Sequence, residues 1–593
     1  MKFMKGITGV LALAATAAFA SALSAQTLQV LTAGSSAQFG PFAEAAWALA
    51  TSGGATAYHY TVKSGACPTS TQNTTCYAYL NDSRSTSIAP EPGNLWVVWN
   101  STGIWAYLSV DSTVGVRAFQ AVPRATLALN LPATPQSAYN AYFDGKSDST
   151  ITTTVINALQ GAALTAANTD IRPEDALFAT NRSLSTLGYA TTGNSLIGNA
   201  IQSAFGTSPA VAHPVSFSIS SSGADPFSGT TPPAFVTIPI GAAPVVFLAN
   251  AASGSVTANA TNITTANAGI LFSGTNCDSS MLGLTSGTAI NPILREPLSG
   301  TMNTAQYSVF WPTYDQENNI NDGNAAPGST SNAGINPLQK KCTAGSGYRY
   351  RAVGTGDEVK AVQAAQTVTG GSAVTNAVGY SFFSYESTGT NASYKYLQLN
   401  GIDPLAYTGG SSYSTGALPS CSTSTTSGTY SCPMAGGASF INLRNGTYPA
   451  WSVYRLITDN NTRTGFTHTN AYYAQNLVTE AQALVNSTIP DFVPFNPVCS
   501  PTSTGSNDPG LDVYREHFVP TTITTVPNAI SITADDGTPN TVNVSCSYNN
   551  PRAGYPHLTL GGTGEAGGDV GGAIEGPFTS VPPAGPVYAT SPH

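Results

Sequence analysis

The stretch Arg295-Glu296-Pro297-Leu298-Ser299-Gly300-Thr301 follows a mostly apolar run and precedes a segment that begins at Met302. This order predicts a strand, a tight turn and a helix. The free N–H groups of a helix's first turn attract an anion, a glycine lets the backbone approach it, and an arginine can clamp it with a charge-assisted pair. The stretch therefore predicts part of an oxyanion site. The plainer interpretation is a helix N-cap with a solvated arginine beside it.

Three further stretches have the same character and favour the oxyanion site. They are Thr32-Ala33-Gly34-Ser35-Ser36-Ala37, Val110-Asp111-Ser112-Thr113-Val114-Gly115-Val116 and Thr169-Asp170-Ile171-Arg172-Pro173-Glu174-Asp175-Ala176. In order and character, the four stretches resemble the phosphate-binding proteins of bacterial phosphate ABC transporters, which have the type II periplasmic binding-protein fold. The apolar segment Ile238 to Asn250 resembles that family's hinge strand, and Gly354 to Tyr385 resembles its second crossing.

The resemblance implies an α/β fold with two lobes, enlarged by inserted β-rich surface segments. It implies a first lobe built from residues 26–250 and 386–496, and a second lobe built from residues 251–385. The two chain crossings are then expected near Asn250 and Tyr385. Residues 497–593 lie beyond the resemblance, and we expect this extension to be partly disordered because its end is rich in Gly and Pro.

Residues 1–25 have the pattern of a secretory signal peptide. Lys2 and Lys5 precede an apolar run from Ile7 to Ala20, and small residues follow. Cleavage after Ala22 and cleavage after Ala25 both remain open. No later apolar run reaches the roughly 18 residues of a membrane-spanning helix, and no cysteine near the cleavage site offers a lipid anchor. We therefore expect a periplasmic or extracellular protein.

The composition limits the partners. Only 9% of the residues are charged and the net charge is -9, so no basic patch for nucleic acid or anionic lipid is expected. Because the net field repels anions, an anionic ligand would have to be held by local donors.

The eight cysteines suit an oxidising compartment because their number is even. We expect sequential pairing because it closes short loops, although the sequence leaves other pairings open. The expected pairs are Cys67 with Cys76, Cys277 with Cys342, Cys421 with Cys432, and Cys499 with Cys546.

Carried over residue by residue, the resemblance assigns seven positions to a phosphate ligand: Ser36, Ser112, Asp175, Arg295, Ser299, Gly300 and Thr301. Hydroxyls and turn amides would donate to the anion, and the guanidinium would supply charge and a planar fork. The carboxylate would accept a hydrogen bond from a protonated oxygen, which admits phosphate and rejects sulfate. The alternative role for Asp175 is that of an acid in a first helical turn.

The chain also departs from the family's pattern. Ala37 stands where the family has an apolar aromatic residue. Pro297 and Leu298 replace an acidic residue and a glycine, so the acid that pairs with the arginine is lost and Glu296 is a candidate substitute.

The expected function is that of a non-enzymatic, monomeric solute-binding protein without a cofactor, which binds phosphate or a related oxyanion and presents it to an ABC-transporter permease. The alternative is a secreted structural or surface protein that keeps the fold with a degenerate site. A phosphoester hydrolase is a weaker alternative, because the six histidines show no metal-binding spacing and no activated nucleophile is evident.

Overall fold

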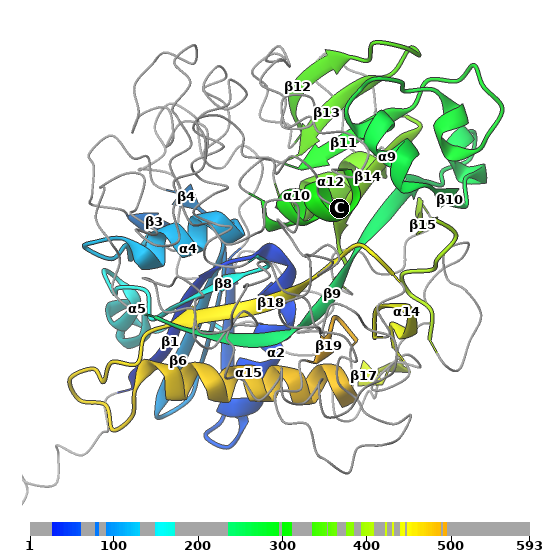
Figure 1. Cartoon of the computed structure of the whole chain (residues 1–593). Helices are drawn as coiled ribbons and strands as arrows, with labels where there is room; N and C mark the ends of the chain where they lie inside the picture. Colours follow the sequence, from blue (N-terminus) through cyan, green and yellow to red (C-terminus); the bar gives the residue numbers. More distant parts are fainter. Residues whose placement is uncertain are drawn as a thin grey trace, which may run out of the picture.

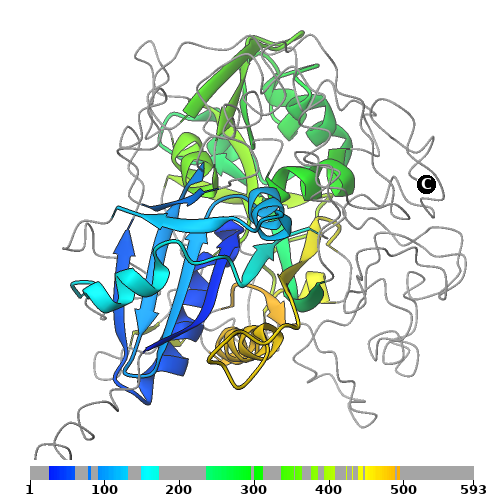
Figure 2. The same ribbon diagram turned by 90° about the vertical axis from the view of Figure 1, so that its left-hand side faces the viewer.

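The structure is a computed structural model. It describes residues 26–60, 78–81, 91–130, 149–171, 235–295, 299–310, 335–352, 354–363, 375–384, 393–407, 422–423, 430–431, 439–444, 448–487 and 490–494. Within these residues, fourteen strands form one mixed sheet. The predicted fold class, mixed α/β with two lobes, is confirmed. Figure 1 shows the first lobe mainly in blue, cyan and gold, and the second in green, and Figure 2 shows them from the side.

The first lobe is built around β1 (Thr27–Gly34). This strand pairs in parallel with β6 (Gly103–Ser109) on one side and with β8 (Ala166–Thr169) on the other. Beyond β6 the sheet continues through the antiparallel strands β5 (Asn94–Trp99) and β2 (Thr56–Tyr60). The carboxyl ends of β1, β6 and β8 therefore lie at one edge of the sheet.

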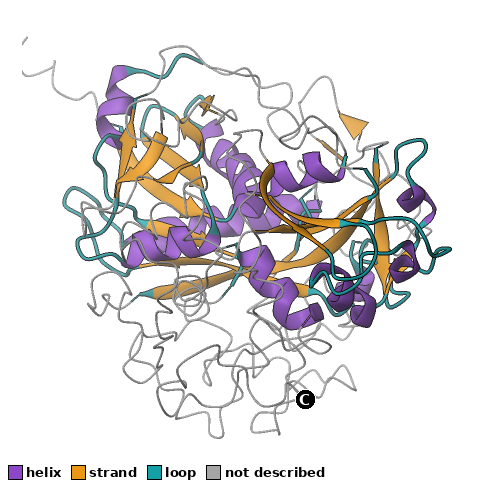
Figure 3. Ribbon diagram, turned by 90° about the horizontal axis from the view of Figure 1, so that it is seen from above, coloured by secondary structure: helices purple, strands orange, loops and turns teal. Residues whose placement is uncertain are grey.

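Both faces of this sheet are buried, and its strands β5 and β6 are accordingly largely apolar. Val30 packs in the core cluster that contains α2 (Phe39–Thr51) and α15 (Asn470–Ser487). Its neighbour Leu31 packs in the cluster of the opposite face, with α4 (Ser112–Gln120) and α5 (Thr153–Leu159). Figure 3 shows helices on both sides of the strands.

One long strand, β9 (Val236–Asn250), belongs to both lobes. Its first part, through Pro244, pairs with β18 (Trp451–Thr458), and Ala242 also pairs with β19 (Val493–Pro494). From Val245 onward it pairs with β14 (Ala377–Phe382), and from Phe247 also with β15 (Tyr394–Leu399). The change of lobe thus falls between Pro244 and Val245, earlier than the crossing expected near Asn250, because β9 exchanges partners there.

The pairing of β15 also differs from the expected division. Tyr394–Leu399 lies on the second-lobe half of β9, whereas the sequence placed residues from 386 onward in the first lobe. The strand β15 thus extends the second lobe, and the chain pairs again with the first-lobe half of β9 later, at β18.

The second lobe continues from β14 to the parallel strands β11 (Asn291–Arg295) and β13 (Tyr348–Ala352), and ends at the antiparallel β12 (Ile335–Lys341). On β9, Val245 and Phe247 pack in the cluster that holds α9 (Thr265–Phe272) and α10 (Gly300–Ala305). Val246 and Leu248 pack instead with α12 (Gly354–Val362). The lobe is therefore also a sheet between helices.

Smaller elements complete the described part. A separate sheet joins β4 (Glu91–Pro92), β3 (Ala78–Asn81) and β7 (Thr126–Leu129). The remaining strands are β10 (Asn262–Ile263), which pairs with β15, and the pair β16 (Ser422–Thr423) and β17 (Tyr430–Ser431). The short helical segments are η1 (Ser36–Gln38), η3 (Val256–Asn259), η4 (Ser279–Leu282), η5 (Gln306–Phe310) and α14 (Ile441–Arg444).

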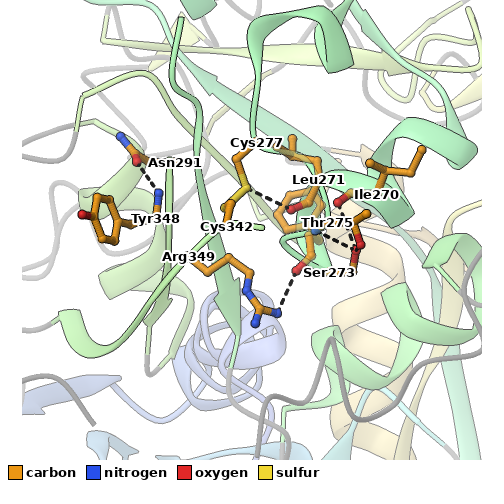
Figure 4. Close-up of a disulfide and its surroundings, with 10 residues drawn as sticks. Ile270, Leu271, Ser273, Thr275, Cys277, Asn291, Cys342, Tyr348 and Arg349 are labelled. Atoms are coloured by element: carbon orange, nitrogen blue, oxygen red, sulfur yellow. Dashed lines mark hydrogen bonds between the residues drawn. A yellow bond between two sulfur atoms is a disulfide. The ribbon is translucent and has the colours of Figure 1, made fainter. Parts of the chain in front are cut away.

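A disulfide joins Cys277 to Cys342, as expected, with a Cα–Cα distance of 5.9 Å. It ties the segment after α9 to the end of β12, and Figure 4 shows it beside Leu271 and Arg349. The other six cysteines, Cys67, Cys76, Cys421, Cys432, Cys499 and Cys546, lie outside the described residues, as do residues 1–25 and 495–593. None of the helices described is both long and apolar enough to cross a membrane.

Candidate anion-binding site

Four strand-to-helix turns meet where the two lobes face each other. The first lobe contributes the turns from β1 into η1 and from β6 into α4, and the second contributes the turns from β11 into α10 and from β13 into α12. Gly34 is in register with Ser109, and Arg295 is in register with Ala352. Because each pair of strands is parallel and adjacent, each pair of turns lies side by side, as ligand-binding turns do in open α/β sheets.

Asp170, the first residue after β8, is the buried carboxylate of this junction, with 3% of its surface exposed. Its Oδ1 accepts hydrogen bonds from Ser35 Oγ and from Gln38 Nε2, the latter at 3.1 Å. Its Oδ2 accepts from Ser112 Oγ at 2.9 Å. Burial raises the pKa of Asp170, and these hydrogen bonds and the Arg295 charge offset that rise only in part.

Arg295 ends β11 and is 1% exposed. Its Nη1 donates to Thr301 Oγ1 at 3.2 Å and to Thr355 Oγ1 at 3.1 Å. Its Nη2 lies 3.4 Å from Asp111 Oδ1, which belongs to the opposite lobe. The guanidinium therefore interacts with polar groups of both lobes.

Two carboxylates flank the guanidinium although the family's pairing acid is absent at Pro297. One is Asp111, and the other is Glu358, whose Oε2 lies 3.9 Å from Arg295 Nη1. Glu358 is held in place because its Oε1 accepts the Tyr380 N–H at 2.8 Å. Glu296, the substitute considered from the sequence, lies outside the described residues.

Gly300 brings the start of α10 close to the first lobe. A Cβ atom at this position would lie 2.6 Å from Ser112 Oγ and 2.8 Å from Asp170 Oδ2. Only glycine fits without a shift of its neighbours, so the start of α10 packs tightly against the first lobe. The preceding Ser299 caps α10, since its Oγ accepts the Met302 N–H at 3.4 Å, and the plainer N-cap interpretation therefore describes this side chain.

Aromatic side chains hold the turn from β1 into η1. The Tyr107 hydroxyl donates to the Ser35 carbonyl at 2.5 Å, and its ring packs edge-on against Phe39 at a centroid distance of 5.5 Å. Trp96 Nε1 donates to the Phe39 carbonyl at 2.9 Å. The turn that carries Ser35 and Ser36 is thus fixed from beneath by buried groups.

The structure brings six of the seven predicted positions to this junction: Ser36, Ser112, Arg295, Ser299, Gly300 and Thr301. Asp175 lies outside the described residues, and Asp170 supplies the carboxylate that the geometry places beside Ser112 and Gly300. Sequence reasoning did not assign a role to Asp170, Asp111, Thr355 or Glu358. The available signal was position, because Asp111 and Asp170 stand just beyond the ends of β6 and β8, where neighbouring parallel strands end together.

The arrangement offers hydroxyl donors, one guanidinium and a buried acceptor to a small oxyanion. Within the described ranges, no group of three His, Cys, Asp or Glu side chains is placed to hold a metal ion.

Comparison with known proteins finds no matching family model and no matching curated protein. Among solved structures, a high-affinity periplasmic phosphate-binding protein bound with phosphate is 13% identical, with 82% of this chain and 96% of that chain covered and a TM-score of 0.30. A phosphate-binding protein from Stenotrophomonas maltophilia is 14% identical, with 63% and 75% covered and a TM-score of 0.27. An ABC-type phosphate transport receptor from Vibrio cholerae is 13% identical, with 41% and 70% covered and a TM-score of 0.23. These TM-scores lie below 0.5, so the fold assignment rests on the strand order and on the partners of β9.

Proposed function

We propose that the chain is a solute-binding protein that takes a tetrahedral oxyanion, phosphate or a close relative, between its two lobes. The observation that carries this proposal is the meeting of two second-lobe residues with the first lobe: Arg295 lies beside Asp111, and Gly300 lies against the Asp170–Ser112 pair. An anion bound there would contact donors of both lobes, so its binding would favour closure of one lobe on the other.

The buried carboxylate supports phosphate over sulfate. A carboxylate beside an anion is repulsive unless it accepts a hydrogen bond from a protonated oxygen of that anion. Phosphate carries such a proton near neutral pH and sulfate does not. The role that the sequence assigned to Asp175 therefore passes to Asp170 in this proposal.

The wider setting follows from the same proposal. The protein would act in the periplasm or outside the cell after loss of residues 1–25, as a monomer without catalytic activity. It would present its ligand to an ABC-transporter permease. The division into lobes would follow the sequence-based ranges, with the crossings moved as β9 and β15 require.

One observation favours a second candidate, a secreted structural or surface protein with a degenerate site. Arg295 already has Asp111 and Glu358 beside it and two threonine hydroxyls on its Nη1. The two carboxylates already balance the charge of this guanidinium. An incoming anion would therefore be attracted less strongly, because both carboxylates would repel it.

Calorimetric titration separates the two candidates. The protein is unfolded, dialysed to remove bound anions, refolded, and titrated with phosphate and with sulfate. Saturable binding of phosphate, with weaker or undetectable binding of sulfate, supports the solute-binding function. Absence of binding by either anion to correctly refolded protein supports the degenerate site.

A further inference from the structure

Thr355 lies where β13 leads into α12, the fourth turn of the junction. The sequence assigned no role to this residue. It is the second residue of α12, and 2% of its surface is exposed. Since Ala352 is in register with Arg295 on the neighbouring strand, α12 begins beside the guanidinium. The side chain is thus positioned by the sheet and not by a flexible loop.

Three groups surround the Thr355 hydroxyl. Arg295 Nη1 lies 3.1 Å away, Ser381 Oγ lies 3.4 Å away, and Ser36 Oγ of the opposite lobe lies 3.1 Å away. A hydroxyl has one hydrogen to donate and two lone pairs that accept. These numbers of donors and acceptors decide the direction of each of the three hydrogen bonds.

Arginine can only donate, so Thr355 accepts from Arg295, and Ser381 donates to the second lone pair. The single Thr355 hydrogen then points to Ser36, which accepts it across the lobe boundary. The Ser36 hydroxyl keeps its own hydrogen, and this hydrogen is free to serve an anion at the junction.

We propose that Thr355 is a positioning residue: its hydroxyl bridges the lobes to Ser36, holds the Arg295 guanidinium, and leaves the Ser36 hydrogen directed toward the bound anion. The part of this inference that concerns the anion rests on the proposed function. The bridge between the lobes does not, because its contacts involve only side chains of the chain itself.

The test compares Thr355→Val, which keeps the shape and loses the hydroxyl, with Thr355→Ser, which keeps the hydroxyl. In phosphate titrations, Thr355→Val should raise the Kd by about tenfold or more, since hydrogen bonds to charged groups are worth more than neutral ones. Thr355→Ser should stay within about threefold of the wild type. In the ligand-free protein, hydrogen exchange at the amides of residues 36–39 and 355–358 should be faster in Thr355→Val and unchanged in Thr355→Ser.

The two readouts separate failure of the inference from failure of the function. If the wild type binds phosphate and Thr355→Val binds it equally well, the inference is overturned and the function stands. If the wild type binds no phosphate, the function fails. In that case, faster exchange in Thr355→Val at both turns still supports the bridge, and unchanged exchange overturns it.

A second variant covers the case in which Thr355→Val does not fold. Ser36→Ala removes the acceptor from the other side of the bridge, so exchange at residues 355–358 should rise although that turn itself is intact. Unchanged exchange there would also overturn the inference.

Discussion

Replacing Asp170 with asparagine should weaken phosphate binding and at the same time admit sulfate. The surrounding donors determine how the new amide is oriented. Ser35 and Gln38 both donate to Oδ1, so a −NH₂ group there would face two donors. The amide nitrogen should therefore take the place of Oδ2, beside Ser112 and facing Gly300. At that place Ser112 can turn its hydroxyl to accept, and the second amide hydrogen points to the ligand.

The magnitude follows from the bond that is lost. A hydrogen bond from a protonated phosphate oxygen to a buried carboxylate is worth about 1.5–3 kcal/mol, which is roughly a 10- to 100-fold rise in the phosphate Kd. Sulfate gains a donor and loses a repulsive charge, so its Kd should fall. The ratio of the two affinities therefore changes by more than either affinity alone.

Calorimetry with both anions on Asp170→Asn and the wild type measures that ratio. Asp459→Asn is a matched control, because Asp459 is also buried and accepts from Asn470 and Arg124, without a contact to the junction groups described above. The reasoning is refuted if Asp170→Asn keeps the wild-type preference for phosphate over sulfate, or if Asp459→Asn changes the preference as strongly.

Three further predictions follow from the same structure. Arg295→Ala should weaken the free energy of phosphate binding by about 2–5 kcal/mol, as truncation of one member of a buried charged pair does. Calorimetry measures this loss, with Arg124→Ala as the control. Equal binding by the two variants would contradict the prediction. Because burial raises the pKa of Asp170 above 3.8, the folded chain keeps this proton where the unfolded chain has lost it. Its contribution to stability should therefore fall as the pH rises from that value through the raised pKa, and the wild-type melting temperature should drop relative to Asp170→Asn over that window. A parallel pH dependence in the two proteins would contradict this expectation. Replacing both Cys277 and Cys342 with serine opens a loop of sequence separation 65 and should lower the free energy of unfolding by about 4 kcal/mol on the chain-entropy model; an unchanged denaturation midpoint would show that the disulfide does not stabilise the fold.

The sequence predicted well those turns in which the residues of the site follow one another along the chain. The turn around Arg295 and Gly300 was predictable because an apolar strand, a glycine and hydroxyls follow one another in the chain. The turn at Ser112 was predictable for the same reason. In both cases, the residues that form the site are neighbours in sequence.

The missed residues owe their place to sheet register, which a single sequence does not display. Asp170 and Asp175 stand in the same stretch of sequence. Only the end of β8 at Thr169 shows that Asp170 lies at the edge of the sheet. Thr355 approaches Arg295 because β13 pairs with β11, and those strands are separated by residues that carry no sign of the pairing. The exchange of partners within β9 was equally hidden, because its apolar run continues unbroken across Pro244.

The sharing of β9 by both lobes has a consequence for how the chain folds. In the sheet, β9 lies between β14 of one half and β18 of the other and so joins the two halves. Each half pairs it with segments far along the chain: β18 is more than two hundred positions away from β9. Such non-local pairings carry a large loop-closure entropy and slow the folding reaction. We therefore expect the two lobes to unfold in a single transition and to refold slowly. A fragment limited to residues 251–385 should remain unfolded, because the strand against which β14 forms would be missing.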